Sequence, residues 1–228
     1  MIKRISAVKL FYVSVVLAFG AISSGCSHNM RITNLDQNFT PPSAVPKQTV
    51  RVGVTSSNMS HPENSKYVNA IVDALQKNSG VERVIYPYSP TNQDQADAVV
   101  DFSVKARYDG KSSNFFVNWP GFLIFAPAIW GYGYTADIET EALITNLKSG
   151  TSQQLSIPLQ YEFRQAEFDR TWTGIGWLEV GIIPLIGGFV FSGYDDDLTP
   201  EFIRSVSPSY GPFVATKTAK AVYDSMGY

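Results

Sequence analysis

Few side chains in this sequence have the types and spacing that chemistry requires. The 228 residues include one cysteine, Cys26, and two histidines, His28 and His61, neither of which has a companion at metal-ligand spacing. The densest acidic run, 195–201, offers oxygens at alternate positions, as calcium sites do, but lacks the glycine and the distal glutamate of a calcium loop. Pro200 favours the start of a helix instead. We expect no metal and no cofactor, and, without a nucleophile–base motif, no enzyme.

The residues before Cys26 give this cysteine its significance. Three basic residues lie within the first nine positions, an almost uninterrupted apolar stretch follows at 10–22, and residues 23–25 are the small Ser-Ser-Gly. This order is that of a secretory signal peptide, because the apolar core is too short for a comfortable membrane span. An exported chain with a single thiol would otherwise carry a reactive group without a partner. The sequence therefore predicts export, with Cys26 at the cleavage site.

Residues 23–26 resemble the lipobox of bacterial lipoproteins, in which the cysteine becomes the lipidated first residue of the mature protein. Ser23 departs from the family pattern, which prefers leucine at that position. The resemblance implies acylation of Cys26, palmitate included, with more than one acyl chain and hence stable anchoring. Because Ser27 stands where aspartate usually retains a lipoprotein in the inner membrane, it also implies the outer membrane of a diderm bacterium, on the periplasmic side. The alternative is an ordinary signal peptide or an N-terminal membrane anchor.

Length and charge limit what the mature chain can be. Without residues 1–25 it has 203 residues, 15 basic and 20 acidic, and a net charge of about −5. A mildly acidic chain argues against a nucleic-acid partner, which requires a clustered basic face. This length is that of one domain with a sizeable core. Since one cysteine allows no internal disulfide, core packing must stabilise the fold.

Apolar periodicity predicts an α+β fold in residues 49–228. We expect a single mostly antiparallel sheet with helices packed on one face, preceded by a polar, proline-bearing tether at 26–48. The turn sequence at 148–151 joins two alternating stretches into a hairpin. The expected elements are strands at 49–54, 81–88, 98–108, 135–147 and 154–164, a helix that begins at Pro62 and ends at Gly80, and a closing helix at about 213–226.

The order of these elements is similar to that of small periplasmic domains of outer-membrane lipoproteins. Examples are the curli secretion channel protein, the lipoprotein activators of peptidoglycan synthases, and the N-terminal domain of the Tol translocation protein. The resemblance covers residues 49–111 and 135–165 and is one of topology, without a shared motif. It implies the α+β architecture and says little about function.

Two aromatic-rich apolar segments interrupt this pattern. Segment 112–136 has no charged residue, and segment 171–194 has only Glu179. Three interpretations remain open: buried core, contact with a membrane, whose headgroup level Trp and Tyr favour, or a protein-binding patch. The residues that we expect to contact a membrane or partner are Trp119, Phe122, Phe125, Trp130, Trp172 and Trp177.

These features predict a lipid-anchored envelope protein that acts as a non-enzymatic binding or assembly factor. Its partners would be the membrane, through the lipid, and an envelope protein or further copies of itself. One alternative is a subunit of a membrane-inserted oligomeric secretion or pore complex, although segment 112–136 shows little of the two-residue alternation of membrane strands. A second alternative is a periplasmic ligand-binding protein or hydrolase that uses Glu179 in an apolar pocket. A paired or solvated Glu179 is the structural interpretation of the same residue.

Overall fold

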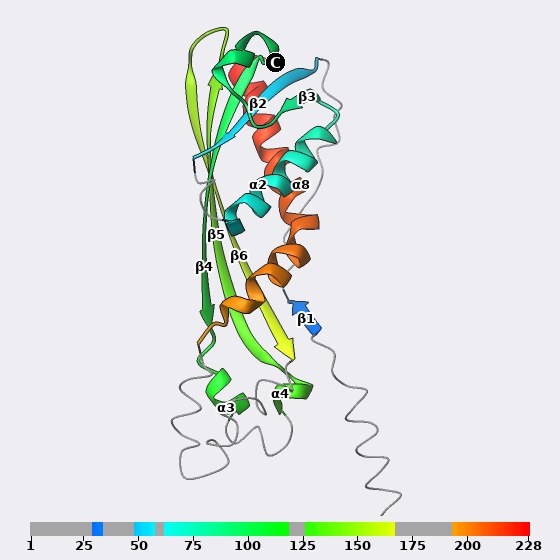
Figure 1. The fold of residues 1–228 in the computed structure, drawn as a ribbon, viewed down its shortest axis with the longest axis vertical. Coiled ribbons are helices and arrows are strands. Elements are labelled where there is room, and N and C mark those ends of the chain that lie inside the picture. The colour runs from blue at the N-terminus through cyan, green and yellow to red at the C-terminus, as the bar shows by residue number, and fades with distance from the viewer. Residues whose placement is uncertain (1–28, 34–47, 58–61, 119–125, 167–192) are drawn as a thin grey trace, which may run out of the picture. The chain divides into compact units, whose positions relative to one another are not determined.

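The computed structural model describes residues 29–33, 48–57, 62–118, 126–166 and 193–228 (Figure 1). Strands and helices alternate along the first part of the chain, a long hairpin follows, and a long helix closes it. In order, the elements are β1 (Asn29–Ile32), β2 (Val50–Ser56), α2 (Pro62–Gln76), β3 (Val81–Ile85), η1 (Pro90–Gln95), β4 (Ala98–Gly110), α3 (Asn114–Asn118), α4 (Ala126–Ile129), β5 (Tyr132–Asn146), β6 (Ser152–Ala166), η3 (Asp196–Leu198) and α8 (Thr199–Met226).

The strands form one six-stranded sheet in the order β1-β6-β5-β4-β2-β3. β2 pairs in parallel with both β3 and β4. The connection through α2 returns the chain to the end of the sheet at which β2 began, and the connection through η1 does so again before β4. β4 and β5 run antiparallel, since their ion pairs join Lys105 to Glu141 and Arg107 to Asp137. The predicted α+β class is confirmed. The sheet is mixed, and the parallel pairing of β2 is the part that periodicity could not indicate.

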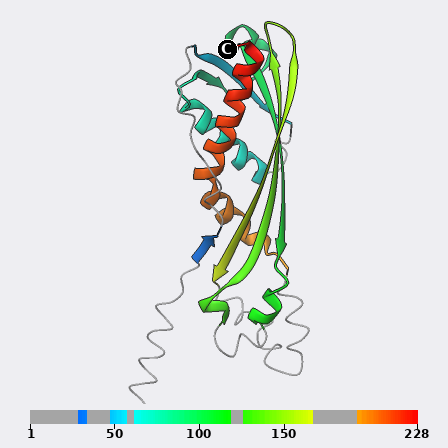
Figure 2. The same cartoon turned by 180° about the vertical axis from the view of Figure 1, so that it is seen from behind.

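The long strands bury one face and expose the other. In β5, residues with even numbers from Tyr134 to Ile144 are buried, and the intervening residues are partly or fully exposed. β4 alternates in the same way from Ala98 to Val104. Figures 1 and 2 show α2 and α8 on the same side of these strands, as predicted. The buried faces of the strands and the two helices therefore form the core.

Helices α2 and α8 pack closely enough to require a glycine. A Cβ built on Gly211 would lie 2.4 Å from the backbone oxygen of Ala70 in α2. The face of α2 that meets the core carries apolar residues at helical spacing, and Glu63 in its first turn suits the helix dipole. These buried residues are Tyr67, Val68, Ile71, Val72 and Leu75.

Helix α8 is twice as long as the sequence predicts. The expected helix at 213–226 is wrong in its start, because α8 begins at Thr199, with a proline in its first turn, and continues through Pro208 and Pro212. Each internal proline removes one backbone hydrogen bond, which normally ends a helix. Buried residues recur from Phe202 to Val222, so tertiary packing outweighs this cost. Strand β3 also ends three residues earlier than predicted, at Ile85.

The chain divides into two compact units. Unit 1 comprises Met1–Arg31, Gly110–Gly133 and Arg164–Gly193, and unit 2 comprises Ile32–Asp109, Tyr134–Phe163 and Tyr194–Tyr228. Strand β1 lies within the range predicted as a tether, yet it pairs with β6 at the edge of the sheet. The amide nitrogen of Thr33, directly after β1, donates to the carbonyl oxygen of Glu162 at 2.8 Å. The polar N-terminal stretch is therefore held to the sheet at 29–33.

Candidate binding surface

Two short neighbouring helices of unit 1, α3 and α4, are fixed in place by backbone contacts. The buried Asn114 side chain donates from Nδ2 to the carbonyl oxygen of Gly133 at 2.8 Å and accepts from its amide nitrogen at 2.7 Å. After α4, Gly131 has a positive φ of 70°, and a Cβ there would lie 2.5 Å from the carbonyl oxygen of Gln165. Only glycine fits this turn. The start of α3 and the end of α4 are thereby defined by their links to the strands.

Helices α3 and α4 and the turn after α4 present large apolar side chains to solvent. Phe116 is 68% exposed, Ile129 is 64% exposed and Trp130 is 52% exposed. α3 contacts α4, and the ring of Phe116 meets that of Phe115 edge-on at 5.3 Å. Among the described residues, the other exposed large apolar side chains are Leu143 and Tyr228, both in unit 2. We refer to Phe116, Ile129 and Trp130 as the unit 1 apolar surface, because exposed apolar groups that cluster mark an interaction site.

The structure divides segment 112–136 between surface and core. Trp130, which the sequence singles out, is exposed, whereas Tyr132, Tyr134 and Ala136 are fully buried at the start of β5. Of segment 171–194, the structure describes Gly193 and Tyr194. The Tyr194 ring stacks on that of Tyr108 with centroids 4.8 Å apart, so this end of the segment contributes to the core. The remaining predicted residues lie outside the described ones: Cys26, Trp119, Phe122, Phe125, Trp172, Trp177 and Glu179.

Phe116 and Ile129 are surface residues that the sequence analysis did not single out. Each lies in a helix of four or five residues, which is too short for apolar periodicity to show which face is buried. The absence of charge between residues 112 and 136 marks the region without saying which side chains face outward. No helix in the part of the chain that the structure describes is long and apolar enough to cross a membrane.

The acidic run 195–201 starts two helices. Asp195 caps η3 by accepting from the amide nitrogen of Asp197 at 3.1 Å, and Glu201 lies in the first turn of α8. Both positions suit the positive end of a helix dipole. Within the described ranges, no cluster of His, Cys, Asp and Glu side chains could hold a metal ion. The helix start predicted at Thr199-Pro200 is confirmed.

A pocket of about 770 Å³ lies in unit 2 between the starts of α2 and α8 and strand β4. Its wall includes Tyr108, whose hydroxyl forms a 2.7 Å hydrogen bond with that of Tyr67. Burial raises the pKa of Tyr108 to about 12 and raises that of Tyr67 further, so both phenols are neutral at physiological pH. The polar residues around the pocket are Glu63, Asn64, Lys105, Tyr108, Asp196, Asp197 and Thr199.

An aromatic cluster fills the core of unit 2. Phe202 of α8 lies at its centre, with ring centroids 4.6 Å from Phe163, 5.6 Å from Tyr108 and 5.9 Å from Tyr161. Offset and edge-on pairs of this kind add to the burial energy. The hydroxyl of Tyr210, another tyrosine of this core, lies 2.7 Å from that of the buried Thr140. Tyr67, Tyr108 and Tyr210 therefore act as packing groups whose hydroxyls have hydrogen-bond partners.

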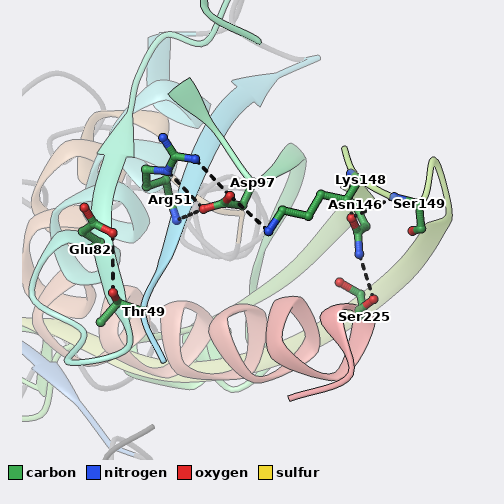
Figure 3. A network of polar contacts seen from close by, with 8 residues as sticks. All are labelled: Thr49, Arg51, Glu82, Asp97, Asn146, Lys148, Ser149 and Ser225. Carbon is green, nitrogen blue, oxygen red and sulfur yellow. Dashed lines mark hydrogen bonds and ion pairs between the residues drawn. The ribbon is translucent and has the colours of Figure 1, made fainter. Parts of the chain in front are cut away.

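A polar network joins β2, the start of β4 and the hairpin turn (Figure 3). Asp97 accepts from Arg51 three times, from the backbone nitrogen at 3.0 Å, from Nε at 3.1 Å and from a terminal guanidinium nitrogen at 3.0 Å. Lys148 Nζ approaches the same carboxylate at 3.8 Å. Asn146, the last residue of β5, donates to the carbonyl oxygen of Ser225, near the end of α8. The network connects the strands to the turn.

Hydrogen bonds from Arg51 and the positive charges of Arg51 and Lys148 hold the pKa of Asp97 below its ordinary value. A carboxylate with a lowered pKa stabilises the fold above its unfolded pKa of about 4, and this contribution disappears as the pH falls through its folded pKa. We therefore expect Asp97→Asn to lower the free energy of unfolding at neutral pH, with the difference from wild type vanishing in acid. Urea unfolding at several pH values measures it, with Glu141→Gln as the matched exposed ion-pair control. A constant difference at all pH values would contradict the ionic role of Asp97.

The comparisons with known proteins give no family assignment. No family model matches the chain, and no curated protein matches it significantly. Solved structures that are similar to it include the following three, all with low TM-scores. A variant of the PelC dodecamer from Paraburkholderia phytofirmans is 12% identical over 60% of this chain and 82% of that one, with a TM-score of 0.30. The PelC dodecamer in another crystal form is 10% identical over 61% and 82%, with a TM-score of 0.28.

The third structure is a minor lipoprotein from Acinetobacter baumannii. It is 9% identical over 72% of this chain and 94% of that chain, with a TM-score of 0.28. At such scores the similarities carry no argument about this protein.

Proposed function

We propose that this chain is a lipid-anchored envelope lipoprotein that acts as a non-enzymatic binding or assembly factor at the periplasmic face of the outer membrane. The unit 1 apolar surface carries the binding part of the proposal, since Phe116, Ile129 and Trp130 are each more than half exposed. The lipobox-like residues 23–26 support the anchoring part. The lipid would confine the protein to the membrane surface and raise its effective concentration for a partner there.

Anchoring requires the thiol of Cys26. When the full chain is produced in a diderm bacterium, we expect palmitate to be incorporated and the protein to fractionate with the outer membrane. Cys26→Ser should abolish both, because the serine hydroxyl cannot replace the thiol in this modification. The measurement is incorporation of labelled palmitate together with fractionation of inner and outer membranes.

Ser27→Ala provides the matched control, since it alters the neighbouring residue and leaves the thiol. This variant should keep both the label and the location. If Cys26→Ser retained the label, or if wild type never acquired it, the lipoprotein proposal would be wrong.

A further inference from the structure

We infer that the unit 1 apolar surface lies against the lipid headgroups of the membrane that holds the Cys26 anchor. This inference rests on the proposed function and names the partner of its binding surface. It concerns Phe116, Ile129 and Trp130, and the partner is a phospholipid bilayer surface that contains anionic lipid.

The chemistry of the surface suits the level of the lipid headgroups. Trp130 combines a large apolar ring with an N–H donor, the combination that is enriched where membranes meet water. Phe116 and Ile129 add apolar area on the neighbouring helices α3 and α4. Because residues 112–136 contain no charge, the segment that carries the surface has no ionised side chain of its own. Insertion to headgroup depth would therefore cost little desolvation.

The anchor leads directly into the unit that carries this surface. Strand β1 begins at Asn29, three residues after Cys26. Three extended residues span at most about 11 Å, so Asn29 must stay within about that distance of the lipidated residue. Residues 29–31 belong to unit 1, as do Phe116, Ile129 and Trp130. A tether that ran freely from 26 to 48 would leave the orientation of the protein open, whereas residues 29–31 keep unit 1 within reach of the bilayer.

The difference in charge between the two units also favours membrane contact through unit 1. The described residues of unit 1 include three cations, Arg31, Lys111 and Arg164, and no acidic side chain. From Cys26 onward, the residues grouped into unit 1 include four basic and three acidic side chains, whereas those of unit 2 include 11 basic and 17 acidic ones. Anionic headgroups attract basic residues and repel an acidic body. Electrostatics therefore favours contact through unit 1.

A second copy of the chain fits the surface less well than a bilayer does. A specific protein interface needs about 800 Å² from each partner, whereas one large aromatic side chain supplies about 150–250 Å² when fully buried. The three partly exposed side chains that the structure describes on this surface fall short of that area. A bilayer sets no such minimum, because the acyl chains on Cys26 provide the attachment and the surface only fixes the orientation.

Spin labels on the anchored protein test this contact. Phe116→Cys, Ile129→Cys and Trp130→Cys are labelled one at a time in the full, processed chain and reconstituted into phosphatidylethanolamine–phosphatidylglycerol vesicles. Leu143→Cys is the matched control, since Leu143 is an apolar residue of unit 2 that is 47% exposed. Accessibility to oxygen, which dissolves in lipid, is compared with accessibility to a nickel chelate, which stays in water.

We expect the ratio of oxygen accessibility to nickel accessibility to be several-fold higher for labels at 116, 129 and 130 than for the label at 143. Three labels show the result even if one variant fails to fold. Equal, water-like ratios at all positions would overturn the inference. So would protection from both reagents with spin–spin broadening, which would place a second copy on the surface.

The mass of the N-terminal peptide separates this inference from the proposed function. An acylated Cys26 with water-like labels refutes the lipid contact and leaves the anchoring intact. If Cys26 is found unmodified, its thiol is removed by Cys26→Ser before the labelling. Labels in lipid on that chain would refute the anchoring and leave the contact intact. The two proposals therefore fail independently.

Discussion

Gly211→Val should lower the free energy of unfolding by at least about 3 kcal/mol, at the upper end of the cost of overpacking a core. A Cβ at this position would lie 2.4 Å from the backbone oxygen and 2.9 Å from the carbonyl carbon of Ala70. Both are main-chain atoms of α2, so a change of rotamer cannot relieve the overlap. The two helices would have to move apart, and the aromatic contacts of Tyr210, the preceding residue, would move with them.

Urea unfolding followed by circular dichroism measures this loss. Lys220→Val, on the exposed side of the same helix, controls for the weaker helix propensity of a β-branched residue, which costs well under about 1 kcal/mol. If Gly211→Val were no worse than Lys220→Val, the close approach of α2 and α8 would be refuted.

Phe202→Ala should cost about 3–5 kcal/mol, because it removes a fully buried ring from the centre of the aromatic cluster. The rings of Phe163, Tyr108 and Tyr161 all contact Phe202 and cannot collapse together into the space it leaves. Thermal and urea unfolding of the purified chain provide the measurement.

Phe116→Ala is the matched control, since it is the same substitution at a ring that is 68% exposed. We expect its effect to stay within about 0.5 kcal/mol, as for other surface positions. Similar losses at the two positions would show that Phe116 is packed in the core, and the unit 1 apolar surface would then not exist.

Apolar periodicity in the sequence predicted the helices and strands that bury one face against a single neighbouring layer of the fold. α2 begins at Pro62 as expected, and the alternation of β5 and β6 identified both strands of the hairpin. β1 was missed because its four residues, Asn-Met-Arg-Ile, are too few to show alternation and are held by pairing with a strand more than 100 residues later. The start of α8 was recognised at Thr199-Pro200, but its continuity through two prolines is decided by tertiary packing.

The candidate surface was predicted as a region and could not be predicted residue by residue. The lack of charge identified segment 112–136 as an unusual apolar region. Within it, Tyr132 and Tyr134 belong to the core, whereas Phe116 and Trp130 lie on the surface. Hydrophobicity alone does not separate these residues. The separation arises from the turn at Gly131, after which β5 begins and alternate residues face the core.

The two prolines of α8 also have a geometric consequence for the core of unit 2. A straight 28-residue helix is a rod about 42 Å long, whereas sheet strands coil steadily along a similar length, so the two would diverge. Pro208 and Pro212 remove the hydrogen bonds that keep a helix straight, and the hydroxyls of Ser205, Ser207 and Ser209 bond to carbonyl oxygens of the same stretch. Figure 1 shows α8 changing direction between its orange and red parts. A helix with weaker internal bonding can thus follow the curvature of the sheet and keep its apolar contacts from one end to the other.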